Sequence, residues 1–300
     1  MGNSNSSVCI RTSTLLKMPV RRALALTKGA FVMNFHKKNG KKNINFIIGV
    51  CLTVFALLFT LVGFFYTPYD PNEMNHLLKN QAPSLLHPFG TDNFGRDILS
   101  RVMEGAGTTF FVGILVVVIG GSIGTVIGAL TGYYGGIIDH VLMRLNDALA
   151  SFPSILLALV FISIFGTGKY NVIAALGIIF IPSFARIVRS EFLVQKELDY
   201  VKNAKLMGAG DFRIMFVHIL PNTKAVLSSA LAIGFNNAVL AEAGMSYLSL
   251  GVQPPDASLG RMLSEAQTYL LNAPWYALFP GLMIIITVLG VALMQSAERY

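Results

Sequence analysis

The sequence predicts an all-α integral membrane protein with six transmembrane helices. Apolar residues make up 54% of the chain and charged residues only 13%, whereas soluble domains carry about 25% charged residues. Six apolar segments approach the length of about 20 residues that a helix needs to cross the hydrocarbon core. They lie at residues 44–66, 109–130, 148–165, 172–188, 224–241 and 275–292. We therefore interpret residues 44–300 as one six-helix membrane domain.

Residues 1–43 precede the first apolar segment and form a basic tail without any acidic residue. Basic residues accumulate on the cytoplasmic side of membrane helices, so we expect this tail in the cytoplasm. Six crossings return the chain to its starting side, which predicts a cytoplasmic C-terminus as well. A secretory signal peptide has its apolar core near the start, but the first long apolar run begins at Ile44. No signal peptide is therefore expected.

Several functional classes are disfavoured by the sequence. The formal charge of +8 does not indicate nucleic-acid binding, because the basic residues concentrate in loops beside apolar segments. Cys9 and Cys51 are too few for a disulfide framework or a zinc site. The chain has no GxxxxGK[ST] or HExxH motif. We therefore expect a protein that is not an enzyme, hydrolyses no ATP itself and needs no cofactor or metal.

The loop at residues 67–108 has more acidic than basic residues, so we expect it outside the cell. Within it, HPFGTDNFGRDILSR at residues 87–101 predicts a structured loop, with Asp92 suited to cap a short helix near Ile98. His87 and the neighbouring aspartates are residue types that bind metals, but their spacing matches no familiar metal site.

Glycines recur every four residues in the second apolar segment, at Gly120, Gly124, Gly128 and Gly132. A stripe without side chains lets a neighbouring helix approach closely. We expect a tight helix crossing here, with a role in packing favoured over a role in gating.

Charged residues mark the start of the third apolar segment, which we expect at the cytoplasmic mouth. Asp139 is suited to cap a helix. Arg144 and Asp147 lie three residues apart on one helical face, where a local ion pair is favoured.

The fifth apolar segment is the most polar, with Asn236, Asn237 and Glu242 in or near it. Polar side chains facing hydrocarbon are costly, so these residues either line a translocation path or form hydrogen bonds between helices. Both interpretations stay open. The following loop, residues 247–274, is expected outside, with a short helix at residues 258–269.

Residues 197–222, here called the elbow, are polar and basic although they lie between apolar segments, within a loop at residues 190–223. Val201, Ala204 and Gly208 follow a helical spacing, and a more apolar repeat starts at Phe212. This predicts two short amphipathic helices joined by a glycine corner. Such an elbow is a docking surface, although basic amphipathic segments also lie flat on lipid headgroups.

The elbow resembles the cytoplasmic coupling loop of ATP-binding cassette importer permeases, in which a glycine is followed thirteen residues later by proline, here Gly208 and Pro221. The family's Glu-Ala-Ala triplet is replaced by residues 202–204, Lys-Asn-Ala. Two further stretches are similar to segments of dipeptide, oligopeptide and nickel permeases. They are HPFGTDNFGRDILSR at residues 87–101 and AEAGMSYLSLGVQPPDASLGRML at residues 241–263. The resemblance extends over about residues 68–286.

The resemblance implies a type I importer permease fold with a cytoplasmic coupling-helix loop, in a bacterial cell membrane. It implies a permease subunit that forms half of a path for peptides, or alternatively for a nickel chelate. The implied partners are a second homologous permease, one or two ATP-binding subunits, an extracytoplasmic substrate-binding protein and membrane lipid. The implied ATPase-coupling residues are Tyr200, Val201, Ala204, Met207, Gly208, Ala209, Phe212, Leu220 and Pro221.

Two rival functions have different consequences. A self-contained channel or ion-coupled carrier would use Glu242 and the asparagines without partner proteins. A non-transporting scaffold would tolerate apolar residues at those positions. Family members usually continue beyond the sixth segment with a glycine-aspartate and a short basic tail. Here the chain reads LGVALMQSAERY to Tyr300, so a truncated or replaced tail is expected.

Overall fold

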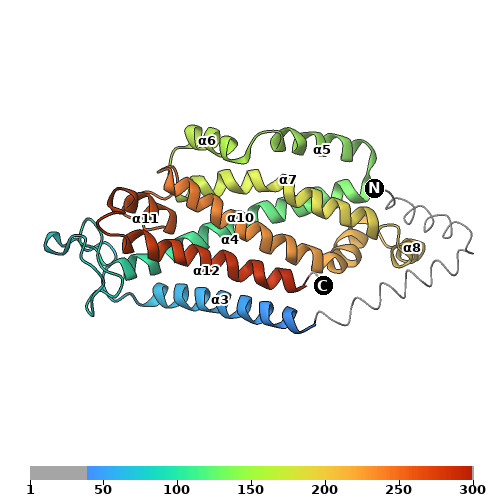
Figure 1. Cartoon of the computed structure of the whole chain (residues 1–300). Coiled ribbons are helices and arrows are strands. Elements are labelled where there is room, and N and C mark those ends of the chain that lie inside the picture. Colours follow the sequence, from blue (N-terminus) through green and yellow to red (C-terminus); the bar gives the residue numbers. More distant parts are fainter. Residues whose placement is uncertain (1–38, 299–300) are drawn as a thin grey trace, which may run out of the picture.

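The computed structural model describes residues 39–298. The predicted basic tail therefore lies almost entirely outside the described residues. Over the described part, the chain is a bundle of long helices without any strand (Figure 1). The prediction of an all-α membrane protein is confirmed.

Five helices are long and apolar enough to cross a membrane. Each contains all or most of one predicted apolar segment. Many of their apolar side chains are exposed on the surface of the bundle, as contact with lipid requires. They are α3 (Asn39–Phe65), α4 (Ile98–Tyr134), α7 (Lys169–Gln195), α10 (Lys224–Tyr247) and α12 (Trp275–Glu298).

The third predicted segment is broken rather than straight. Helices α5 (Gly136–Ala150) and α6 (Ser154–Phe165) meet at an angle of 88°, and only together do they pass as a sixth span. Pro153 lies at the break, where it has no N–H to donate and disfavours helical geometry at the preceding residue. The expected single helix over residues 148–165 is therefore wrong, because the proline ends one helix and starts another.

Helix α4 starts at Ile98 instead of residue 109, so the predicted short helix is its first part. Asp97 caps it by accepting a hydrogen bond from the backbone N–H of Ser100 at 2.8 Å. The cap expected at Asp92 is not formed, because that carboxylate accepts hydrogen bonds from the N–H groups of Phe94 and Arg96. Hydropathy misses this first part of α4 because it contains charged residues that are nevertheless buried, such as Arg101, 1% exposed.

The glycine stripe of α4 packs directly against α7, which confirms the predicted tight crossing. A Cβ atom at Gly128 would lie 2.6 Å from the carbonyl oxygen of Ala185, and one at Gly124 would lie 2.6 Å from Cβ of Phe184. The backbones therefore approach more closely than any other residue would allow. Helix α10 packs on α4, α7 and α12, and α12 also packs along α3.

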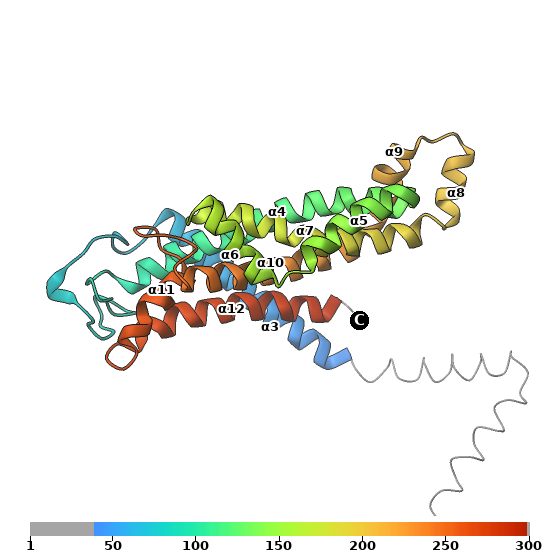
Figure 2. The ribbon, with the colours of Figure 1, turned by 90° about the horizontal axis from the view of Figure 1, so that it is seen from above.

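The two ends of the bundle carry different structures (Figures 1 and 2). One end is the cap, consisting of residues 66–97 and 248–274, with α11 (Leu259–Ala266). Ser258 caps α11 by accepting from the N–H of Arg261, which confirms the predicted short helix in this loop. The opposite end carries the elbow, together with the start of α3 and the end of α12.

Candidate functional site

The elbow consists of two short helical arms joined by a glycine corner, as predicted. Helix α8 (Asp199–Leu206) is followed by Gly208, whose φ of +82° lies in the region that glycine adopts without strain. The second arm starts with α9 (Asp211–Arg213) and continues as a π-helical segment, Ile214–Ile219. A 3-10 turn, Leu220–Thr223, then leads into α10.

One face of the elbow is anchored on the bundle. Val201 of α8 is almost completely buried, as are Ile214, Met215 and Ile219 of the π-helical segment. They form one apolar cluster with α4 and α7, whose buried members are Ala129, Tyr133, Val188, Phe192, Val201, Ile214, Met215 and Ile219. The elbow is therefore packed as a continuation of the α4–α7 pair.

The other face of the elbow exposes large apolar side chains among charged ones. Met207 is 88% and Phe212 72% exposed. Among the remaining predicted coupling residues, Gly208 and Pro221 are exposed, Val201 is buried, and Tyr200, Ala204, Ala209 and Leu220 are half-buried. The predicted set therefore divides into an exposed face and side chains that hold it in place.

The charged residues of α5 pair with α7 instead of with each other. Asp139 accepts two hydrogen bonds from the guanidinium of Arg189, at 2.6 and 2.7 Å. Asp147 pairs with Arg186 at 2.8 Å. The expected Arg144–Asp147 ion pair is thus not formed, because an arginine of α7 reaches Asp147 instead. Within the described residues, α5 is held along α7 by two ion pairs.

Glu242 and Asn236 lie inside the subunit. Glu242 is fully buried and its Oε1 accepts a hydrogen bond from the Ser246 hydroxyl at 2.6 Å. The hydroxyl groups of Thr109 and Ser258 lie beside the carboxyl group. The amide of Asn236 donates to the backbone oxygen of Val288 in α12 at 3.1 Å. The Asn236 contact is a hydrogen bond between helices, as in the second of the two interpretations left open by the sequence, whereas the Glu242–Ser246 bond lies within α10.

Asn237, in contrast, is exposed on the face between α7 and α10. There it lines a hollow of about 70 Å³ together with Ser183 of α7. The other lining side chains are mainly apolar, including Ile187 and Ile233. Ser183 was not predicted, since a lone serine in an apolar segment gives no signal by itself. The two elements bring these polar groups to one surface.

A buried network of charged side chains connects the segments of the cap. Arg96 pairs with Asp92 at 2.6 Å and with Glu265 of α11 at 3.0 Å. Glu265 also accepts hydrogen bonds from Arg261 and from the hydroxyl of Tyr276, at 3.1 and 2.7 Å. Burial alone would lower the pKa of Arg96, but the two carboxylates raise it above its ordinary value. The network joins segments that are distant in sequence, which explains why no local pattern predicts it.

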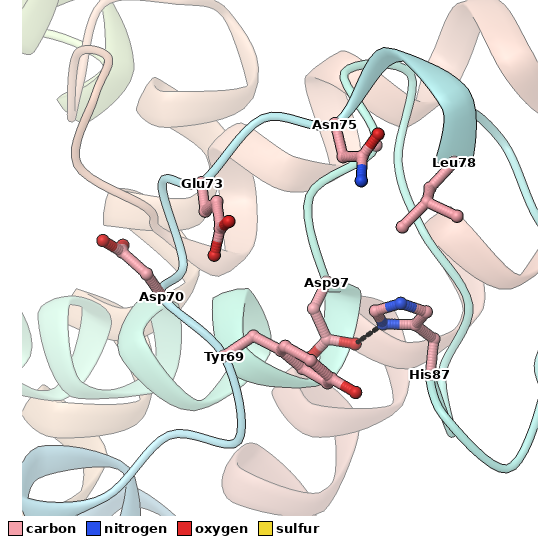
Figure 3. A pocket seen from close by; sticks show the side chains of 8 residues that line it. Tyr69, Asp70, Glu73, Asn75, Leu78, His87 and Asp97 are labelled. Carbon is pink, nitrogen blue, oxygen red and sulfur yellow. Dashed lines mark hydrogen bonds and ion pairs between the residues drawn. The ribbon is translucent and has the colours of Figure 1, made fainter.

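A cavity of about 130 Å³ also lies in the cap (Figure 3). On one side, Nδ1 of His87 lies 2.9 Å from Oδ1 of Asp97, and the ring of Tyr69 packs beside the imidazole. Asp70 and Glu73 line another part of its wall. Among residues 39–298, no group of three or more potential ligands is arranged to hold a metal ion. His87 is therefore paired within the fold.

Comparisons with known proteins agree with this architecture. The family described as binding-protein-dependent transport system inner membrane component matches residues 124–297. The glutathione transport system permease protein GsiD of Pectobacterium atrosepticum is 40% identical over 84% of this chain and 85% of its own length. The dipeptide transport system permease protein DppC is 36% identical in Haemophilus influenzae, over 86% of this chain and 90% of that relative. DppC of Alkalihalophilus pseudofirmus is 38% identical over 87% of this chain and 86% of its own length.

The matched region extends from the glycine stripe of α4 through the elbow to the end of α12. It thus includes both the anchored coupling candidate and most of the membrane helices. The relatives extend the similarity over more than four fifths of the chain. This chain belongs to the family of binding-protein-dependent transport system inner membrane components and is a multi-pass membrane permease subunit.

Proposed function

We propose that this permease subunit belongs to an ATP-driven importer of peptides. The similar proteins GsiD and DppC are named for the transport of glutathione and dipeptides, which supports a short peptide over the nickel chelate. The substrate would arrive from an extracytoplasmic binding protein, in keeping with the family description. ATP would be hydrolysed by one or two separate subunits, because this chain has no nucleotide-binding loop.

The observation that carries the proposal is the exposed apolar face of the elbow. Met207 and Phe212 project from a short segment whose opposite face is packed in the α4–α7 cluster. An exposed apolar patch on a firmly supported element is typical of an interface between proteins. A self-contained channel or carrier has no need of one. We infer that the elbow seats on the ATPase subunit, with Gly208 at the corner.

The translocation path is proposed to lie on the face between α7 and α10. Asn237 and Ser183 give this face polar groups in otherwise apolar surroundings, and exposed polar groups at membrane depth belong beside water or a partner. One subunit exposes this face without enclosing it. We infer that a second homologous permease faces it, so that each subunit forms half of the path. Glu242 and Asn236 then stabilise the bundle behind it.

Transport in this proposal is a two-state switch. ATP closes the ATPase subunits, the elbow moves with them, and the helices change from inward-facing to outward-facing. Hydrolysis restores the first state. The elbow, both chain ends and the mouth formed by Asp139, Arg144 and Asp147 would lie in the cytoplasm, and the cap would face the binding protein.

Replacing Met207 by aspartate tests the docking face. The side chain is exposed, so the subunit should fold and insert, but a charge in an apolar interface loses its partner's contacts. We expect retention of the ATPase subunits on the purified permease to fall at least tenfold. Leu271→Asp is the matched control, because Leu271 is an exposed side chain, 99%, in the cap. Equal retention by both variants would refute docking at the elbow.

The same complex, reconstituted in vesicles with its binding protein, tests the substrate. We expect ATP-dependent uptake of a labelled dipeptide that excess unlabelled dipeptide abolishes and chelated nickel leaves unchanged. Uptake of the nickel chelate instead would assign the alternative substrate. Uptake without ATP or partner subunits would favour the self-contained carrier. With Met207→Asp, dipeptide uptake should fall together with ATPase retention.

A further inference from the structure

Tyr133, in the last turn of α4, contacts both arms of the elbow. Its hydroxyl donates a hydrogen bond to Oδ1 of Asp211 at 2.6 Å. The ammonium of Lys205 lies 5.0 Å from the centroid of its ring, within the range of cation–π attraction. The side chain is only 8% exposed although it lies at the end of the helix. Neither the resemblance nor the comparisons assign a role to this residue.

The two contacts of Tyr133 lie on opposite sides of the glycine corner. Lys205 belongs to α8 and Asp211 begins α9, with Gly208 between them. A Cβ atom at Gly208 would meet no heavy atom within 4 Å, so no side chain packs on Gly208 itself, and the corner is closed by a hydrogen bond from the N–H of Ala209 to the carbonyl oxygen of Ala204 at 3.0 Å. Tyr133 bridges that angle from the bundle side.

Tyr133 also lies beside one of the close contacts between α4 and α7. A Cβ atom at the preceding residue, Gly132, would lie 2.6 Å from Cβ of Phe192 in α7. Both Tyr133 and Phe192 belong to the apolar cluster that anchors the elbow. A force applied to either arm therefore reaches the α4–α7 pair through this ring.

We propose that Tyr133 is a positioning residue that makes the elbow move as one body with α4 and α7. This inference rests on the proposed coupling to an ATPase. Without the hydroxyl contact, the arms would still be held by Val201 and Ile214, but rotation at Gly208 would absorb displacement that otherwise moves the membrane helices. The residue thus determines how much transport each ATP hydrolysed produces, separately from whether the ATPase binds.

Tyr133→Phe tests this role in the reconstituted complex, because it removes the hydroxyl and retains the ring in its apolar cluster. A hydrogen bond to a carboxylate biases an equilibrium by roughly tenfold or more. We expect peptide transported per ATP hydrolysed to fall by roughly tenfold, with ATPase retention unchanged. Asp211→Asn should weaken the same contact. The double variant should be no worse than the more impaired single variant, because both changes affect one hydrogen bond.

Tyr134→Phe is the matched control, since the neighbouring ring is 47% exposed and its variant should keep the wild-type ratio. A wild-type ratio in Tyr133→Phe would overturn the positioning role and leave the docking proposal intact. Loss of ATPase retention in Tyr133→Phe would also overturn it, because the residue would then act on docking. If the wild-type subunit retains no ATPase, the proposed function fails and the positioning role fails with it.

Discussion

Glu265 is the residue that holds the segments of the cap together. Its carboxylate accepts hydrogen bonds from Arg96 in the loop before α4, from Arg261 of α11 and from Tyr276 of α12. Burial would raise the pKa of Glu265, but the hydrogen bond from Tyr276 and the nearby Arg101 and Arg96 lower it below the ordinary value. The carboxylate is therefore ionised in the folded cap and matched by several donors.

Glu265→Gln should destabilise the cap because it leaves Arg96, whose side chain is 4% exposed, short of a buried counter-charge. Removing one partner of a buried pair costs about 3 kcal/mol or more. We expect a lower midpoint of thermal unfolding in detergent. Asp256→Asn is the matched control, since the Lys169–Asp256 ion pair is 31% and 42% exposed, and pairs of this kind contribute less than about 1 kcal/mol.

Comparing the wild type with Glu265→Gln also tests a predicted pH dependence of stability. The folded-state pKa of Glu265 is lowered, so its stabilising contribution is present above the unfolded pKa, about 4.3. It is lost as the pH falls through the lower folded pKa. The unfolding midpoint of the wild type should therefore approach that of Glu265→Gln on acidification below about pH 4. If the unfolding midpoints of the wild type and Glu265→Gln differed by the same amount at every pH, the proposed role of the Glu265 charge would be contradicted.

At the scale of elements, the α4–α7 pair shows what a local pattern predicts well. Four glycines at a spacing of four place a bare stripe on one side of any helix, whatever the rest of the fold. The same holds for the elbow, whose amphipathic spacing and Gly208 corner are properties of one short segment. The contact made by Tyr133 was missed because its partners, Lys205 and Asp211, lie on other elements and nothing in α4 indicates them.

Interactions between elements explain the other differences. Asp147 was paired with Arg144 by proximity in sequence, whereas Arg186 of α7 reaches it in the fold. The break between α5 and α6 was missed because mean hydropathy stays high across Pro153 and does not register a change of direction. Arg101 and Glu104 separated the predicted short helix near Ile98 from the apolar segment, since hydropathy does not anticipate burial of charges in the cap.

Gly128→Ala tests the close approach of α4 and α7. The added methyl group would lie 2.6 Å from the carbonyl oxygen of Ala185, so the helices must separate, and such overpacking costs about 1–3 kcal/mol. We expect a lower unfolding midpoint in detergent.

Gly107→Ala, on the same helix, is the matched control, because its methyl group would meet only Thr60 at 4.0 Å. That variant should be neutral or more stable, because alanine favours helix by about 1 kcal/mol. Equal effects would show that the stripe is not tightly packed.

The whole subunit is polarised between the elbow at one end and the cap at the other (Figure 1). The start of α3 and the end of α12 lie at the elbow end, in agreement with an even number of crossings. That number requires α5 and α6 to act together as one span, because α6 alone has 12 residues and is too short to cross the hydrocarbon core. The proposed coupling requires the elbow end to be cytoplasmic.

Single cysteines at the two ends test this orientation in a chain whose Cys9 and Cys51 are replaced by serine and alanine. Lys202 in the elbow and Lys79 in the cap are both exposed, so Lys202→Cys and Lys79→Cys should fold normally. The excess of basic residues around the elbow favours the cytoplasmic side. A membrane-impermeant maleimide should therefore label Lys79→Cys in spheroplasts and Lys202→Cys only in inside-out vesicles. The reverse pattern would place the elbow outside, where no ATP-driven subunit could reach it, and coupling through Tyr133 and Gly208 would be impossible.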